Sequence, residues 1–235
     1  MQTVEIQVND KKIKAEAGQT VLAACRQNGI EIRTLCALKG LSMVGACRLC
    51  LVEMEGSPRL FPACTTLVAA NQKYRTDTER LRKYQRLTVE LLFAERNHVC
   101  SVCVANNRCE LQNLGYQVGM DHVRFPYLNP PCPVDASHPY FVLDHNRCVL
   151  CTRCVRVCDE VEGAHNWDVQ GRGIESRVIS DFCQPWGEST TCTSCGKCLE
   201  VCPVGAIWPK DKAQGQVEKR PDFVSELIEK RKVKP

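Results

Sequence analysis

Residues 148–158 read CVLCTRCVRVC, and residues 192–203 read CTSCGKCLEVCP. Both stretches carry the pattern CxxCxxCxxxC, so the second is an internal repeat of the first. Three cysteines at two-residue gaps surround one side of a cubane [4Fe-4S] cluster, and the fourth cysteine of each run is left to bind the other cluster. The repeat therefore predicts two crossed ligand sets: Cys148, Cys151, Cys154 and Cys202; and Cys158, Cys192, Cys195 and Cys198. Structural zinc is the alternative for CxxC motifs, but it takes two separated pairs instead of four cysteines in a row.

Cysteine accounts for 18 of the 235 residues, which indicates either a disulfide scaffold or metal chemistry. The N-terminus has no basic region followed by an apolar one, and no stretch approaches the length that crosses a bilayer. We therefore expect a cytoplasmic chain without a transmembrane segment, in a compartment where disulfides are disfavoured. The formal charge of +4 counts every thiol as neutral, and thiolate-bound clusters make the protein acidic. This removes the argument for a nucleic-acid partner.

The N-terminal residues predict a small sheet with one helix. Residues 4–8 (VEIQV) and 12–16 (KIKAE) have the composition of two short strands, and residues 19–29 (QTVLAACRQNG) have helical spacing and end in Asn28 and Gly29. A long loop follows. Its cysteines fit a planar [2Fe-2S] cluster, in which two thiolates bind each iron, although a zinc loop is also chemically possible. They are Cys36, Cys47, Cys50 and Cys64.

Residues 77–96 (DTERLRKYQRLTVELLFAER) give the clearest helical pattern, with Asp77 or Thr78 as its N-cap. The predicted apolar stripe consists of Leu81, Tyr84, Leu87, Leu91 and Leu92. The stretch NHVCSVCVANNRCELQ (97–112) comes next and supplies only three thiolates for a cubane that needs four ligands: Cys100, Cys103 and Cys109. His98 is the nearest side chain that can donate a lone pair, and we predict it as the fourth ligand. Cys132 and an open iron site are the alternatives.

Residues 126–139 (PYLNPPCPVDASHP) are rich in proline and predict an extended linker. Two strand-like pieces, residues 166–171 and 176–182, separate the two cysteine runs. The tail from residue 220 is a candidate amphipathic helix, either solvated or docked on a partner through Phe223, Leu227 and Ile228. Three cysteines remain without a ligand role, and we expect them to be structural: Cys25, Cys132 and Cys183.

The ordered set of four motifs resembles the N-terminal electron-transfer region shared by the large iron-sulfur subunit of complex I and by [FeFe] hydrogenases. A stand-alone chain of this length is similar to the small iron-sulfur diaphorase subunit of NAD-linked bidirectional [NiFe] hydrogenases. The resemblance implies an α+β protein with a β-grasp [2Fe-2S] ferredoxin-like domain (1–76) and a small helical His/Cys [4Fe-4S] domain (77–125). The proline-rich linker (126–139), a two-[4Fe-4S] ferredoxin-like domain (140–210) and a C-terminal tail (211–235) follow.

No pattern for bond-making chemistry is present: there is no GxGxxG after a strand, no P-loop and no cysteine arrangement for nickel. We therefore predict no catalytic residue, one [2Fe-2S] cluster and three [4Fe-4S] clusters. The resemblance implies a non-catalytic oxidoreductase subunit of an NAD(P)-linked hydrogenase complex. It would relay electrons between a flavin/NAD(H)-binding diaphorase subunit and the small and large subunits of a [NiFe] hydrogenase, with a further [2Fe-2S] subunit or ferredoxin as an additional candidate partner.

Three other functions remain open from sequence. The chain could be the relay subunit of an NAD-linked formate dehydrogenase, or a free polyferredoxin carrier. The third is a protein without redox function that is stabilised by structural zinc and serves in protein–protein interaction.

Overall fold

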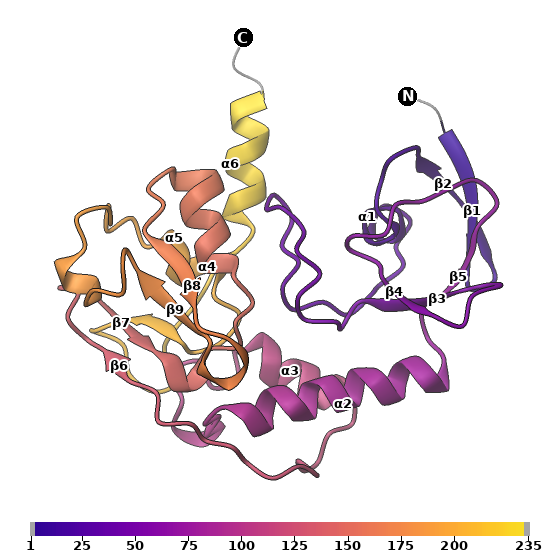
Figure 1. Ribbon diagram of the computed structural model, residues 1–235. Coiled ribbons are helices and arrows are strands. Elements are labelled where there is room, and N and C mark those ends of the chain that lie inside the picture. Colours follow the sequence, from indigo (N-terminus) through magenta and orange to yellow (C-terminus); the bar gives the residue numbers. More distant parts are fainter. Residues whose placement is uncertain (1–2, 233–235) are drawn as a thin grey trace. The chain divides into compact units, whose positions relative to one another are not determined.

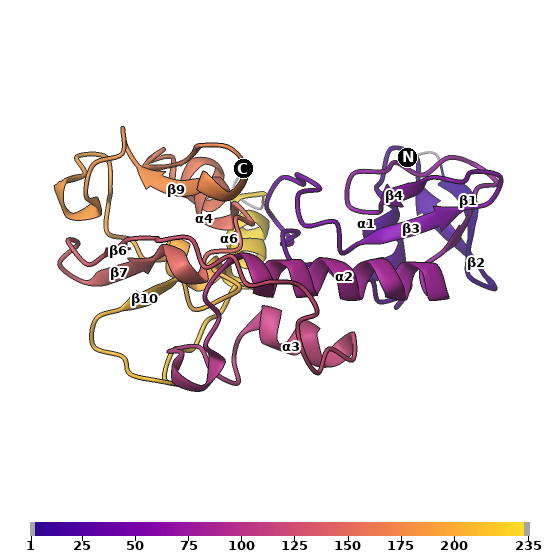
Figure 2. The same cartoon turned by 60° about the horizontal axis from the view of Figure 1, so that its bottom comes forward.

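The computed structural model describes residues 3–232, and the chain forms two compact units (Figures 1 and 2). One unit comprises Met1–Ala37 and Met43–Val89, and the other comprises Leu38–Ser42 and Glu90–Pro235. Helices and strands are mixed in an α+β architecture, as the sequence predicts. Within residues 3–232, no helix is long and apolar enough to cross a membrane.

The N-terminal unit contains a five-stranded sheet in the order β2-β1-β5-β3-β4. The predicted strand pair is confirmed as an antiparallel hairpin, and β1 also pairs in parallel with β5. Strands β3 and β4 form a second antiparallel pair, which joins the sheet through β5. The elements are β1 (Thr3–Val8), β2 (Lys11–Glu16), α1 (Val21–Gln27), β3 (Leu51–Met54), β4 (Leu60–Pro62) and β5 (Lys73–Arg75).

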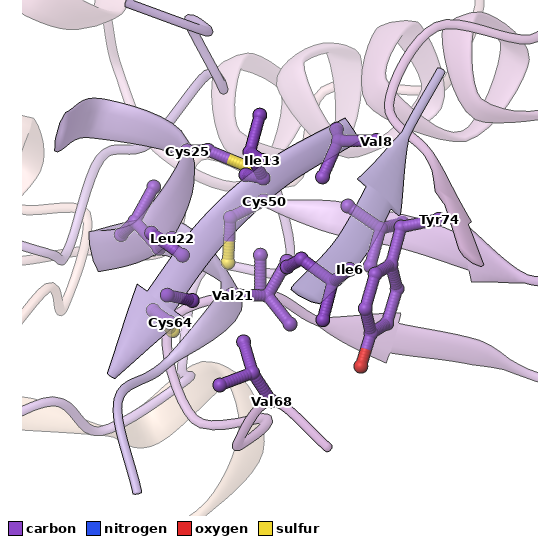
Figure 3. Packing of buried hydrophobic residues seen from close by; sticks show 14 of the residues in the cluster. Ile6, Val8, Ile13, Val21, Leu22, Cys25, Cys50, Cys64, Val68 and Tyr74 are labelled. Atoms are coloured by element: carbon purple, nitrogen blue, oxygen red, sulfur yellow. The ribbon is translucent and has the colours of Figure 1, made fainter. Parts of the chain in front are cut away.

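The core of this unit lies where α1 meets the sheet. Alternation along the hairpin buries Ile6 and Val8 from β1 together with Ile13 from β2. Helix α1 begins at its cap Thr20, whose hydroxyl accepts a hydrogen bond from the Ala23 amide at 3.2 Å. Figure 3 shows buried side chains of α1, among them Cys25, and of the sheet, together with Cys50 and Cys64. The core is thus continuous with two of the predicted ligands.

Helix α2 (Glu79–Glu95) confirms the predicted helix, and Thr78 is its cap, since the Thr78 hydroxyl accepts from the Leu81 amide at 3.2 Å. The predicted apolar stripe is wrong in part, because Tyr84 and Leu91 are 40% and 47% exposed. Gln85 is buried beside Leu81 instead. Its amide accepts from Arg33 at 2.9 Å and donates to the Leu49 carbonyl at 3.3 Å, so a polar side chain is satisfied on the buried face.

The C-terminal unit contains a three-stranded sheet in the order β10-β7-β6 and a separate antiparallel pair, β8 and β9. The pair β8–β9 confirms the two strand-like pieces between the cysteine runs. Strand β6 falls inside the proline-rich stretch, so the last part of the predicted linker belongs to a sheet. The elements are α3 (Glu110–Gln117), β6 (Val134–Asp135), β7 (Phe141–Asp144), α4 (Arg153–Arg156), β8 (Trp167–Gln170), β9 (Arg177–Ser180), α5 (Lys197–Val201), β10 (Ile207–Pro209) and α6 (Phe223–Lys232).

Helix α6 confirms the predicted helix in the tail, and it packs within its own unit. A Cβ at Gly40, whose φ is +94°, would lie 2.9 Å from carbons of both Val224 and Ile228. Val224 is fully buried, and Arg231 donates to the Val161 carbonyl at 3.0 Å. Part of the apolar face of α6 is therefore occupied by the chain itself.

Candidate metal centres

Cys36, Cys47 and Cys50 lie on the loop between α1 and β3, and the end of β4 brings Cys64 to them. Cys50 directly precedes β3 and Cys64 follows β4, and the Ala63 amide donates to the Cys50 carbonyl at 2.9 Å, which aligns the two strand ends. The Cys36 amide lies 3.5 Å from Cys47 Sγ. Hydrogen bonds from the Cys47 and Cys64 thiols lower the pKa of Cys36 to about 2. Four sulfurs gathered from the segment before β3 and the end of β4 match the donor set that a [2Fe-2S] cluster takes.

Cys25 lies apart from that set, on the buried face of α1. It is fully buried in the apolar core, and burial raises the pKa of its thiol to about 11. The prediction that Cys25 acts as a small hydrophobic residue is confirmed.

His98 and the three cysteines of the second set line one cavity in the C-terminal unit. Burial and then the charge of Arg147 lower the pKa of His98 to about 4, so the ring is neutral. Its Nε2 atom is buried without a hydrogen-bond partner, while the ring is hydrogen-bonded to the backbone at Leu92. A neutral histidine with one nitrogen anchored and the other free is the form that binds a metal. The residues fit a cluster with one imidazole and three thiolates: His98, Cys100, Cys103 and Cys109.

The alternative fourth ligand, Cys132, is placed elsewhere. Arg96 donates a hydrogen bond to Cys132 Sγ, and Cys132 is not among the residues that line the His98 cavity. Arg96 also donates to the carbonyls of Ile174 at 3.2 Å and Ser176 at 2.7 Å. The contact with Arg96 gives Cys132 a partner of its own.

The backbone around the His98 cavity is adapted to its sulfurs. Cys109 is the N-cap residue of α3, and burial raises the pKa of its thiol to about 11. A Cβ at Gly205 would lie only 2.5 Å from Cys103 Sγ. Only glycine leaves room for that sulfur.

A second cavity is lined by the predicted crossed set: Cys158, Cys192, Cys195 and Cys198. Cys158 lies in a π-helical turn after α4. Cys192 and Cys195 lie on the loop that leads into α5, and Cys198 lies in the first turn of that helix. The thiolates of Cys195 and Cys192 raise the pKa of Cys158 beyond the effect of burial. The structure thus brings the fourth cysteine of the first run to the three cysteines of the second.

The reciprocal set is Cys148, Cys151, Cys154 and Cys202. Burial raises the pKa of Cys148 to about 12 and that of Cys151 to about 11, and the Cys202 thiolate adds to both. Burial likewise raises the pKa of Cys154, followed by the charges of the other three cysteines. Mutual electrostatic effects of this kind require the four sulfurs to lie close together.

The cluster sites are surrounded by charged residues that the sequence patterns did not identify. Arg153, between two predicted ligands, is buried and makes hydrogen bonds of 2.6 and 2.8 Å to the Glu110 carboxylate. Arg147 lines the His98 cavity; burial opposes its ionisation, but the charges of Cys103 and Asp144 raise the pKa of its guanidinium. A signal was present in the sequence, because both arginines stand beside a ligand cysteine. Asp144, a partner of Arg147, is only three residues away, whereas Glu110, the partner of Arg153, is 43 residues away.

Cys183, the last unassigned cysteine, is exposed, and Arg177 donates to its sulfur at 3.2 Å. All eighteen cysteines lie in the described part of the chain, and none forms a disulfide. Between residues 3 and 232, no three His, Cys, Asp or Glu side chains meet at the spacing that a single metal ion requires.

Three family models match consecutive parts of the chain. Residues 1–79 match a 2Fe-2S iron-sulfur cluster binding domain, and residues 85–124 match the NADH-ubiquinone oxidoreductase-G iron-sulfur binding region. Residues 138–208 match the ferredoxin-like domain of NADH-quinone oxidoreductase subunit 3. These ranges contain every cysteine of the four predicted sets.

Similar proteins fall into two groups by length. The chain is 36% identical over 209 residues to a subunit of the NADH-quinone oxidoreductase of Rhizobium meliloti, covering 87% of this chain but only 24% of that relative. It is 34% identical over 209 residues to the gamma subunit of the NAD-reducing hydrogenase HoxS of Cupriavidus necator, covering 88% of both. A crystal structure of NAD⁺-reducing [NiFe]-hydrogenase in the H2-reduced state contains a chain of 34% identity, with a TM-score of 0.84 and coverage of 89% and 88%.

Proposed function

This chain belongs to the family of iron-sulfur subunits that includes the gamma subunit of NAD-reducing hydrogenase, and from this membership we propose that it is an electron relay. It passes electrons between a flavin/NAD(H)-binding diaphorase subunit and the small and large subunits of a [NiFe] hydrogenase. The observation that carries the proposal is the match over 88% of both this chain and that gamma subunit. Since the chain spans about a quarter of the length of the Rhizobium meliloti relative, the role of that longer protein is not transferred to it.

We propose one [2Fe-2S] cluster and three [4Fe-4S] clusters, bound by the four sets described above. Bound clusters supply one-electron redox chemistry, and the chain contributes ligands, burial and fixed charges that set their potentials. His98 contributes its Nε2 atom as a neutral ligand. This assignment is supported because His98 lines the cavity and its buried Nε2 atom has no hydrogen-bond partner. A neutral ligand in place of a thiolate favours the reduced cluster, because it lowers the negative charge at the site.

The finer layout is part of the proposal. It consists of a β-grasp domain (1–76), a His/Cys domain (77–125), a linker (126–139), a two-cluster domain (140–210) and a tail (211–235). The order of the matched family models supports it. A reducing, cytoplasmic setting is supported by the eighteen free thiols.

Association with partners tests the relay role. Tagged chain purified anaerobically from its own cells should retain flavin-containing and nickel-containing subunits, and hydrogen should reduce NAD⁺ or NADP⁺ in the eluate. A chain that emerges as a monomer without flavin or nickel would instead be a free carrier. Co-purification with a formate-oxidising chain would assign it to a formate dehydrogenase; the similarity over full length to a hydrogenase subunit favours the hydrogenase.

A further inference from the structure

The two halves of the cysteine repeat share the same backbone donors to equivalent sulfurs. The Leu150 amide donates to Cys148 Sγ at 3.5 Å, and the Ser194 amide donates to Cys192 Sγ at 3.4 Å. Leu150 and Ser194 adopt the same left-handed conformation, with φ of +50° and +55°. The two halves of the repeat can therefore be compared with each other, and a side-chain donor that is present in one half and absent from the other can be identified.

Side-chain donors distinguish the two halves. The indole Nε1 of Trp186 donates a hydrogen bond to Cys192 Sγ at 3.2 Å. Trp167 lines the same cavity, beside Trp186. The sequence contains one other tryptophan, Trp208 on β10, and within residues 3–232 no tryptophan donates to the equivalent sulfur of Cys148.

Both indoles are fixed by their surroundings. Trp186 is 1% exposed and Trp167 is 5% exposed, and their rings meet edge to face at 4.7 Å. The Trp186 ring also stacks on Phe141 at 5.6 Å, and its backbone amide donates to Asp135 Oδ2 at 2.7 Å. Each ring lines the cavity of the Cys192 set, so the Trp186 donor cannot turn away without repacking that core.

A hydrogen bond to a ligand sulfur stabilises negative charge on that sulfur. Reduction adds one electron to a cluster, so donors to its ligands favour the reduced state and raise the reduction potential. We propose that Trp186 sets the potential of the cluster held by Cys158, Cys192, Cys195 and Cys198 above the value that its four thiolates alone would give. Trp186 does not bind iron; it acts by positioning a donor. The proposal rests on the ligand sets of the proposed function.

Because Cys195 is exposed, this cluster lies near the protein surface. A raised reduction potential makes this cluster a favourable site for an electron that enters or leaves the relay. Trp186 thus gives the second half of the repeat a different redox role from the first, although both halves have four cysteine ligands.

The test is an anaerobic redox titration of the cluster-loaded chain, monitored by EPR, for Trp186→Phe. Phenylalanine keeps an aromatic ring and removes the N–H donor. The variant should lower the midpoint potential of one [4Fe-4S] signal, and the other three signals should not move. Loss of that same signal in Cys158→Ala identifies the cluster. Trp208→Phe is the matched control and should shift no signal.

A second variant separates the donor from packing. Replacing Trp186 by β-(3-benzothienyl)alanine keeps the two fused rings and puts sulfur in place of the N–H, so the same downward shift is expected even if Trp186→Phe loads poorly. Unchanged potentials in the analogue variant, with full iron content, would overturn the tryptophan proposal and leave the relay role intact. A wild-type chain with no cluster at the Cys192 set would overturn both.

Discussion

The ion pair between Glu110 and Arg153 joins two of the proposed cluster sites, and Glu110→Gln tests its contribution. Glu110 follows the ligand Cys109, and Arg153 stands between Cys151 and Cys154. The guanidinium is 2% exposed and donates to both carboxylate oxygens, at 2.6 and 2.8 Å. Glutamine keeps the size of the side chain but removes its charge, so the Arg153 cation stays buried without its counter-charge.

The free-energy cost of Glu110→Gln follows from the burial of the two side chains. Removing one partner of a fully buried ion pair costs about 3 to 5 kcal/mol, because the remaining charge is uncompensated. The Glu110 side chain is 41% exposed, so solvent screens part of that cost, and we discount it to about 2 kcal/mol. If the pair stays intact until the sites open, the barrier to cluster loss falls by that amount, which corresponds to about a 30-fold faster rate.

Bleaching of visible absorbance under anaerobic mild denaturant measures this rate. Glu218→Gln is the matched control, because its partner Arg108 and Glu218 itself are 45% and 76% exposed, and an exposed pair contributes under about 1 kcal/mol. The reasoning fails if Glu110→Gln and Glu218→Gln lose their clusters at the same rate.

Three further changes probe the ligand sets. His98→Cys should keep a cubane but lower its reduction potential in an EPR titration, because it adds a negative charge. His98→Ala should favour loss of one iron, which leaves a three-iron species. Unchanged spectra and potentials in both variants would show that His98 is not a ligand and would make Cys132 the next candidate. Cys158→Ala should abolish the signal of the Cys192 set, and loss of the Cys148 signal instead would disprove the crossed assignment. Gly205→Ala should reduce loading of the His98 site alone, because the added methyl group would lie 2.5 Å from Cys103 Sγ, and full iron content in this variant would show that the site can widen.

Local patterns were sufficient where the physics is local. The β1–β2 hairpin, α1 and the Thr78 cap of α2 are confirmed because alternation, helical spacing and capping depend on neighbouring residues. The repeat also predicted the two crossed groupings of cysteines, since the ligand spacing of a two-cluster module is fixed by the size of the cluster. Their role as ligands remains a prediction.

Contacts between remote residues could not be predicted in this way. Gln85 replaces Tyr84 on the buried face of α2 because Arg33, 52 residues away, supplies its hydrogen-bond partner. Strand β6 forms inside a proline-rich stretch because β7 offers it a pairing edge. Trp186 precedes Cys192 by six residues, and nothing in that spacing indicates that its indole donates to the sulfur.

The number of iron atoms bound by the full chain tests the central claim most directly. Anaerobic analysis of the purified chain for iron, acid-labile sulfide and zinc should give about 14 iron atoms and a matching amount of sulfide, with no stoichiometric zinc. About eight iron atoms would mean that only the two cysteine runs carry clusters, which contradicts the sites at Cys36 and His98. Stoichiometric zinc in place of iron would contradict the account as a whole.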